Sequence, residues 1–145
     1  MKALTLWRPW DQAIVHGSKR IENRPWALYP NMVGKPIAIH AGKRYDDDGA
    51  ISMQLSKLYA PPPPADSPLG IVGVMVVGSV VNESDPRADR NVLESAWFNG
   101  PFGWVLTEVA ALDEPIPVSG KQGLWTLPPD VEQRVLEQLP RFRGR

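Results

Sequence analysis

The stretch LTLWRPWDQAIVHGSKRIENR, residues 4–24, contains the start of a strand, a short helix and a charged segment in quick succession. Its apolar beginning predicts a strand over 3–6. Pro9 suits the first position of a helix, where its missing N–H costs nothing, and His16 followed by Gly17 is typical of a helix end. We therefore expect a short helix over 9–16 and a second strand over 21–25.

The charged segment GSKRIENR, residues 17–24, is the strongest candidate for a binding site. In a regular strand Glu22 and Arg24 lie on the same face, and Lys19 sits in the turn before it. Lys19 and Arg24 are suited to hold a phosphate or an electronegative base edge. Glu22 is suited to accept N–H groups of a base edge, or else to orient Lys19.

Three residues outside this segment are second candidates for the same site. Arg8 adds a positive charge at the start of the helix, Trp10 offers a ring on which a base can stack, and His40 is a candidate base or donor. Each also has a structural alternative: a lone histidine is commonly a satisfied core residue. The charged segment has one too: a Glu22–Arg24 or a Lys19–Glu22 pair can be only a surface ion pair, worth about 0–1 kcal/mol.

The rest of the chain reads as further strands with helices between them. Residues 46–48 suit a helix cap better than a metal site, since they lack a ligand-loop spacing and no histidine cluster accompanies them. The run 61–64, all proline, ends the helix that begins after residues 46–48. We expect further strands over 35–41, 70–81, 102–112 and 123–127. We also expect three further helices. One follows residues 46–48 and has apolar positions at Ile51, Leu55 and Leu58, one lies over 87–97, and the last has apolar positions at Val131, Val135 and Leu139.

This order predicts an α+β fold: a small mixed β-barrel with helices packed around it. Regular βα alternation is missing, which disfavours a doubly wound sheet. Of six tryptophans, we expect Trp97, Trp104 and Trp125 in the core, whereas Trp7, Trp10 and Trp26 bracket the charged segment. Glycine pairs lack any phosphate-loop pattern, and we expect no metal and no cofactor.

Composition limits the classes of protein and of site that are possible. The 145 residues fit a single domain, 1–145, and the absence of cysteine excludes disulfides, thiolate metal sites and a cysteine nucleophile. The most apolar stretch, 70–81, is too short to span a bilayer, and the first residues lack the apolar run of a secretory signal. We therefore expect a soluble cytoplasmic protein. Its formal net charge is zero, which argues against broad nonspecific binding to polyanions.

The stretch 4–24 also resembles the opening of the ASCH domain family, a branch of the PUA-like superfamily of RNA-associated β-barrels. The family's mark is a proline-aromatic helix start followed by Gly-x-Lys-x-x-Glu-x-Arg, which here is Pro9-Trp10 and then Gly17, Lys19, Glu22 and Arg24. The segments IAIHAGKR and FGWVLTEVAALDEPIPVSGKQGLWTLP are similar to later strands of the family. The resemblance covers roughly residues 3–128.

The resemblance implies a PUA-like barrel whose Lys–Glu–Arg motif lines a cleft, and a nucleic-acid-binding module that recognises RNA, a single strand or an extruded nucleotide. It leaves open an enzyme on the same cleft, with Lys19 and Glu22 as the catalytic candidates. Some relatives are ribonucleases. Others hydrolyse acetylated cytidine, but with a threonine where this chain has Glu22, which cannot act as that hydroxyl nucleophile. Arg8 stands where the family pattern has glutamine. A protein-interaction module that uses the proline run 61–64 is a third hypothesis.

Overall fold

The structure is a computed structural model that describes all 145 residues. The chain forms two compact units that alternate along the sequence, and each is described by itself. Unit 1 comprises Met1–Ser18, Pro36–Met75 and Val109–Arg145, and unit 2 comprises Lys19–Lys35 and Val76–Glu108. Strands β4 (Gly70–Asn82) and β5 (Phe102–Ile116) contribute residues to both units. None of the helices has the length and apolar character needed to cross a bilayer.

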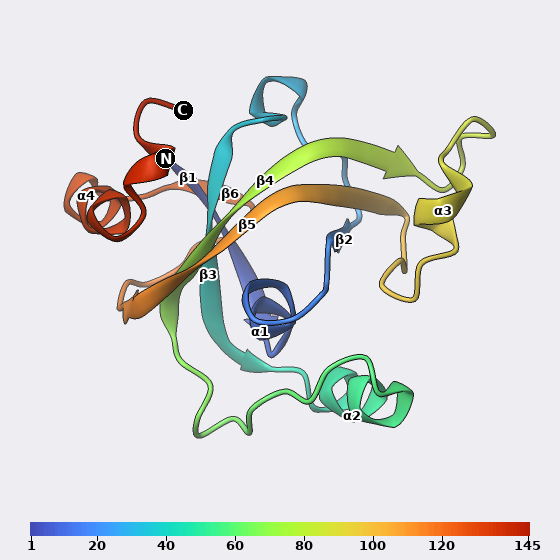
Figure 1. The fold of residues 1–145 in the computed structure, drawn as a ribbon, viewed down its shortest axis with the longest axis horizontal. Coiled ribbons are helices and arrows are strands. Elements are labelled where there is room, and N and C mark those ends of the chain that lie inside the picture. Colours follow the sequence, from blue (N-terminus) through green and yellow to red (C-terminus); the bar gives the residue numbers. More distant parts are fainter. The chain divides into compact units, whose positions relative to one another are not determined.

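Six strands are hydrogen-bonded in the order β2-β5-β4-β3-β1-β6 (Figure 1). β1 runs parallel to β3 and antiparallel to β6, and β2 runs antiparallel to β5, so the sheet is mixed. The remaining strands are β1 (Lys2–Arg8), β2 (Ile21–Arg24), β3 (Pro36–Tyr45) and β6 (Leu124–Thr126). The α+β class is confirmed. The sheet is not closed, because β2 and β6 are its two edges, so the expected barrel is matched only loosely.

In unit 1 the apolar faces of β1 and β3 form the base of the core. Leu4 pairs with Ile39, and both are buried, as is Ile37. The short helix α1 (Trp10–Val15) contacts both strands and buries Ile14. Pro9 precedes α1 as its N-cap, and its carbonyl accepts from the amides of Gln12 and Ala13. The predicted strand–helix order of the opening stretch is confirmed.

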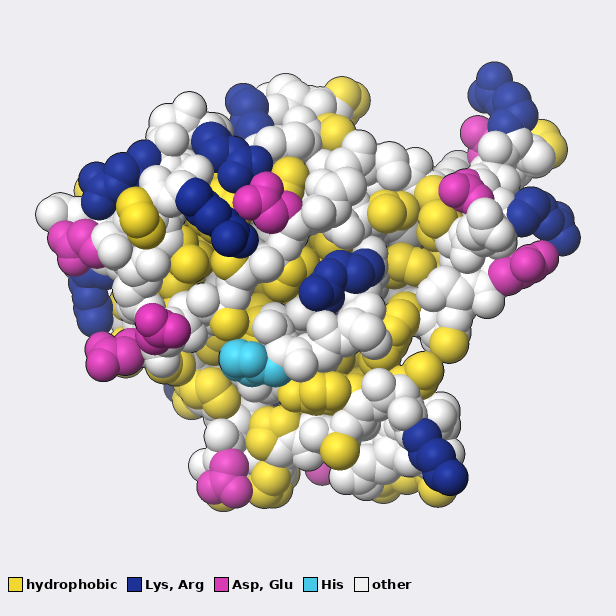
Figure 2. Space-filling model, viewed as in Figure 1, with side chains coloured by type: hydrophobic (Ala, Val, Ile, Leu, Met, Phe, Trp, Pro, Cys, Tyr) yellow, Lys and Arg dark blue, Asp and Glu magenta, His cyan; other side chains and the backbone are white.

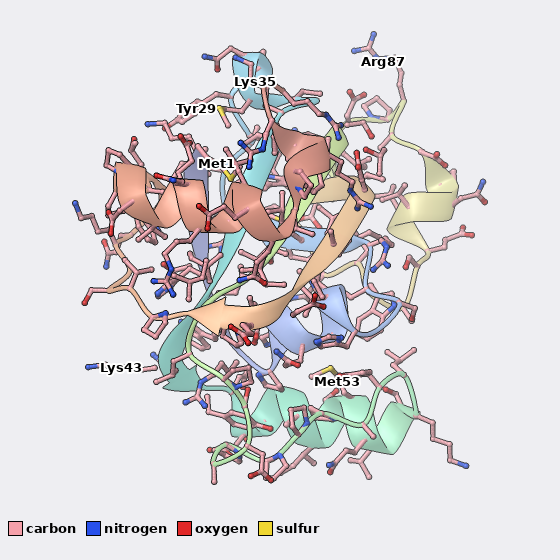
Figure 3. All side chains as sticks on the ribbon, turned by 60° about the vertical axis from the view of Figure 1, so that its left-hand side comes forward. Met1, Tyr29, Lys35, Lys43, Met53 and Arg87 are labelled. Carbon is pink, nitrogen blue, oxygen red and sulfur yellow. The ribbon has the colours of Figure 1, made fainter.

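Helix α2 (Asp47–Ser56) presents a different face to the protein from the one its sequence suggested. Ile51 and Leu55 are 54% and 79% exposed, and the buried side is formed by Gly49, Ala50 and Met53. Met53 lies on the side of α2 that faces α1 (Figure 3). The Ile51–Leu55 stripe therefore faces outward, and apolar side chains gather over this part of the surface (Figure 2). Asp46 caps α2 as predicted, since its carboxylate accepts from the Gly49 amide.

The closing helix α4 (Pro129–Gln138) follows its apolar pattern. Val131 and Val135 are buried, as the spacing predicts. The chain's amino group forms an ion pair with Glu132, which places the N-terminus beside α4 (Figures 1 and 3). The 3-10 helix η2 (Pro140–Phe142) then buries Phe142 in unit 1.

Unit 2 holds β2, the 3-10 helix η1 (Pro30–Met32) and the short helix α3 (Arg90–Leu93). The predicted helix over 87–97 is wrong in length, because α3 has only four residues. Polar side chains hold the flanking backbone in turns instead: Asp85 accepts from the Arg87 amide, and the Ser95 hydroxyl accepts from the Trp97 amide. Trp104 is fully buried, as predicted, whereas Trp97 is half-buried.

Candidate functional site

The candidate residues divide between the two units. Lys19, Glu22 and Arg24 belong to unit 2, where β2 and the turn before it carry them. The second candidates, Arg8, Trp10 and His40, belong to unit 1.

The antiparallel pairing of β2 with β5 fixes the direction of the motif's side chains. Glu22 lies opposite Trp104, and Arg24 opposite Phe102. Directly opposite residues of an antiparallel pair project to the same face, with Cβ atoms about 5 Å apart. The Leu106 amide donates to the Arg20 carbonyl, so the pairing continues into the turn that carries Lys19. The expected placement of Glu22 and Arg24 on one face follows directly from this register.

Lys19 and Glu22 form a buried pair. Lys19 is 2% exposed and Glu22 is 7% exposed, and the Lys19 ammonium lies 3.9 Å from Glu22 Oε1. The ammonium also donates to the Ile21 carbonyl. Burial lowers the pKa of Lys19, which the Glu22 carboxylate opposes and the Arg24 charge reinforces. The alternative of an exposed surface ion pair is therefore wrong.

The second carboxylate oxygen of Glu22 is the most unusual atom of the motif. Oε2 is buried and has no hydrogen-bond partner in the protein. A buried acceptor without a donor costs about 1–3 kcal/mol, and more when it is charged, so native proteins rarely leave one. The fold thus holds a carboxylate oxygen in place without giving it a donor of its own.

The remaining motif residues of β2 have distinct environments. Arg24, the last residue of the strand, is only half-buried. Asn23 projects to the opposite face and holds the turn before β5: its amide group donates to the Trp97 carbonyl at 3.0 Å, and its oxygen accepts from the Asn99 and Gly100 amides at 2.8 and 3.1 Å. Sequence reasoning gave Asn23 no role, because these partners are more than 70 residues away.

Arg8 is bound by backbone in unit 1. It is 8% exposed, and its guanidinium donates to four carbonyls at 2.7–3.1 Å, those of Gly42, Lys43, Pro64 and Ser67. The side chain thus connects the end of β3 to the last residue of the proline run and to Ser67. A guanidinium with these partners has a structural role, and its contact with a ligand stays a prediction.

Trp10 and Gly17 have structural roles at the two ends of α1. The Trp10 indole donates to Asp46 at 2.9 Å, and its ring packs where a side chain at Gly49 would stand. A Cβ on Gly17 would lie 2.6 Å from the Ala13 carbonyl oxygen and 3.0 Å from the Tyr59 ring. Gly17, the first residue of the motif, therefore needs to have no side chain, because the chain passes close to the Tyr59 ring where α1 ends. Base stacking by Trp10 stays a prediction.

His40 lies inside a hydrogen-bonded network of unit 1. It is buried, its Nε2 is 2.7 Å from the Val118 carbonyl and its Nδ1 is 3.1 Å from the Thr5 hydroxyl. Trp125 packs edge-on against the ring and donates to the same hydroxyl. Burial lowers the pKa of His40, and the Val118 carbonyl opposes that shift. These contacts favour the structural alternative for His40 over a role as a base.

Asp11, in the first turn of α1, is a buried titratable residue that was not among the candidates chosen from the sequence. It is 0% exposed; one oxygen accepts from the Gln12 amide at 3.0 Å, and the other has no hydrogen-bond partner. Burial raises the pKa of Asp11 to about 6, against smaller opposing effects from Gln12 and Arg8. Its position in unit 1 could not be inferred from its sequence neighbours, which suit an exposed first turn equally well.

Comparison with solved structures identifies the fold. The ASCH protein of Zymomonas mobilis matches 94% of this chain over 93% of its own, with a TM-score of 0.52 and 16% sequence identity. The chain has the ASCH fold. Two mutants of the same protein match it as well. A tyrosine-to-phenylalanine mutant gives a TM-score of 0.54 at 16% identity over 94% of this chain and 96% of its own, and a serine-to-alanine mutant gives 0.52 at 17% identity over 94% of each chain.

No family model and no curated protein matches the sequence. The resemblance drawn from the Gly17–Arg24 motif is thus supported by three-dimensional structure, at an identity that establishes the ASCH fold and nothing finer.

Proposed function

We propose that this chain is a nucleic-acid-binding module, acting in the cytoplasm, that recognises a nucleotide of a single strand with the side chains of β2. The observation that carries the proposal is Glu22 Oε2, a buried carboxylate oxygen without a donor in the protein. The exocyclic amino groups of bases are donors that a carboxylate accepts from specifically. The family resemblance, which associates this fold with RNA, favours a base as the source of that donor.

Arg24 supplies the positive charge of the proposed site. It lies two residues from Glu22 on the same strand face and is half-buried, so its guanidinium is suited to a phosphate next to the recognised base. Lys19 holds Glu22 in place from within: it is almost fully buried and contacts both Glu22 and the Ile21 carbonyl. Lys19 is thus a positioning residue in this proposal.

The test is an equilibrium titration of short single-stranded RNA, single-stranded DNA and free nucleotides against the wild type and Glu22→Gln. Glutamine keeps the size of the side chain and removes its charge. A charge-assisted hydrogen bond is worth about 1.5–3 kcal/mol, so we expect affinity to fall by about tenfold or more. Glu94→Gln is the matched control in the same unit, because Glu94 is exposed and pairs only with Arg90. Equal affinity of wild type and Glu22→Gln would refute the proposal.

One observation favours a second candidate, a hydrolase on the same residues. A buried lysine whose pKa is lowered, beside a carboxylate, is a common arrangement for acid–base chemistry. The titration mixtures are therefore also assayed for cleaved RNA and altered nucleoside. Turnover that Lys19→Met abolishes while binding persists would establish the enzyme, and intact ligand throughout would leave binding alone.

A further inference from the structure

An aromatic row extends from the proposed site to the surface of unit 2. Trp104, directly opposite Glu22, is fully buried and contacts Trp26 edge-on, with ring centroids 4.9 Å apart. Its indole donates to the Trp26 carbonyl at 3.2 Å, which fixes Trp26 over it. Trp26 in turn lies against Tyr29, with centroids 5.9 Å apart and the planes inclined by 33°.

The outer end of this row is open. Tyr29 is 59% exposed, although its ring contacts that of Trp26. The ring of Trp104 contacts that of Trp26, and Tyr29 contacts Trp26, so Tyr29 lies at the outer end of the row with most of its surface exposed. Lys35, which follows η1 in the sequence, is also exposed, and Figure 3 labels both residues.

We infer that the ligand of the β2 site is a single-stranded oligonucleotide rather than a free nucleotide, and that Tyr29 stacks on a neighbouring base. The inference rests on the proposed function and deepens it. Aromatic rings stack on bases of any sequence, and proteins that bind single strands place such rings beside cations that follow the backbone. The ring of Trp26 contacts both the ring opposite Glu22 and the ring of Tyr29, with centroid distances of 4.9 and 5.9 Å, so Tyr29 is suited to the base next to the one at Glu22.

The side chains at each end of the aromatic row suit the nucleotide that we assign to that end. The inner end offers a carboxylate oxygen and Arg24, which read one base and its phosphate. The outer end offers a ring and the Lys35 ammonium, which bind a base and a phosphate of any sequence. Sequence preference is therefore confined to the nucleotide at Glu22, and the nucleotide at Tyr29 adds affinity without preference.

The experiment compares a mononucleotide with single-stranded RNAs of increasing length, by calorimetry or fluorescence anisotropy. Wild type should bind the oligonucleotides more tightly than the mononucleotide. Tyr29→Ala should weaken oligonucleotide binding by about tenfold and leave mononucleotide binding unchanged, since one stacked base contributes roughly this much. Tyr29→Phe keeps the ring and should bind like the wild type. Leu55→Ala, on exposed α2, is the control for removal of an exposed apolar side chain.

The outcomes separate this inference from the function on which it rests. Oligonucleotides that bind no more tightly than the mononucleotide, or that bind Tyr29→Ala as tightly as the wild type, would overturn the role of Tyr29 while the β2 site stands. A wild type that binds neither mononucleotide nor oligonucleotide would overturn both. Loss of mononucleotide binding in Tyr29→Ala would also contradict the inference, because the ring would then belong to the first nucleotide's site.

Discussion

Asp11 makes the stability of this protein depend on pH in a direction opposite to that of a typical carboxylate. Its pKa is raised by burial from 3.8 to about 6, so the folded state favours the protonated form. The stability that it contributes is fully present below pH 4 and is lost as pH rises through about 6. Two pKa units correspond to about 3 kcal/mol.

Asp11→Asn removes this titration, since an amide carries no charge at any of these pH values. We expect the free energy of unfolding of the variant, relative to wild type, to rise between pH 4 and pH 7 by up to about 3 kcal/mol. Denaturant unfolding at several pH values measures it. Asp130→Asn is the control, because Asp130 also lies in the first turn of a helix but is exposed. A difference between Asp11→Asn and wild type that does not change with pH would show that the carboxyl titrates normally.

At the residue scale, the sequence was enough to propose candidate residues, but not to predict the structural contacts of their neighbours. Lys19, Glu22 and Arg24 could be chosen from spacing alone, because strand alternation needs only local geometry. The roles of Arg8, Trp10 and Asn23 depend on partners distant in sequence: four carbonyls of residues 42–67, the Asp46 carboxylate and the turn before β5. Long-range pairing decides those roles, and a single sequence carries no signal for it.

At the scale of elements, the entry into β4 depends on a close backbone approach. Gly70 has φ +92°, and a Cβ there would overlap the Ile116 carbonyl of β5. We expect Gly70→Ala to destabilise the protein by about 3 kcal/mol or more, from the strained φ and from the clash with backbone that cannot move aside.

Gly123, just before β6, provides the comparison. Its φ is +65°, but nothing lies within 4 Å of the Cβ position, so Gly123→Ala should cost only about 1–2 kcal/mol. Thermal and denaturant unfolding of both variants measures the difference. If Gly123→Ala costs as much as Gly70→Ala, the backbone angle accounts for both losses and the contact with β5 does not.

Elements with strong local signals were predictable, and elements set by packing were not. The helix α4 follows its apolar spacing, and the caps at Asp46 and His16 fall where the sequence places them. The helix α2 buries Gly49 against the Trp10 ring, buries Ala50 as well, and leaves Ile51 and Leu55 exposed. Hydrophobic spacing predicts the larger side chains as the buried face, but here the close approach of the Trp10 ring to the helix backbone at Gly49 favours the face with the small residues.

At the scale of the whole molecule, charge is balanced within each unit. Unit 2 has six lysines and arginines against six aspartates and glutamates, and unit 1 has ten against ten. Residues 1–45 contain eight lysines and arginines against two acidic residues, and the two units share this excess equally. Nucleic-acid binding by this chain has to come from a few placed cations, because neither unit has the net positive charge that drives nonspecific binding.

A small number of phosphate contacts predicts a shallow dependence of affinity on salt. Each contact with a single strand contributes a slope of about −0.7 to the plot of log K against log salt concentration. With Arg24 and Lys35 as the contacts, we expect a slope between about −1 and −2 for a short single-stranded RNA. Titrations over roughly 50–200 mM salt measure it.

Arg24→Gln should make that slope shallower by about 0.7, and it should weaken every sequence alike, since a phosphate contact carries no base preference. Arg87→Gln, which removes an exposed arginine of the same unit (Figure 3), should change neither slope nor affinity. Glu22→Gln should leave the slope unchanged and alter the base preference, because it acts on a base edge. If Arg24→Gln leaves the slope of the wild type intact, Arg24 contacts no phosphate, and the cations that do so lie elsewhere in the chain.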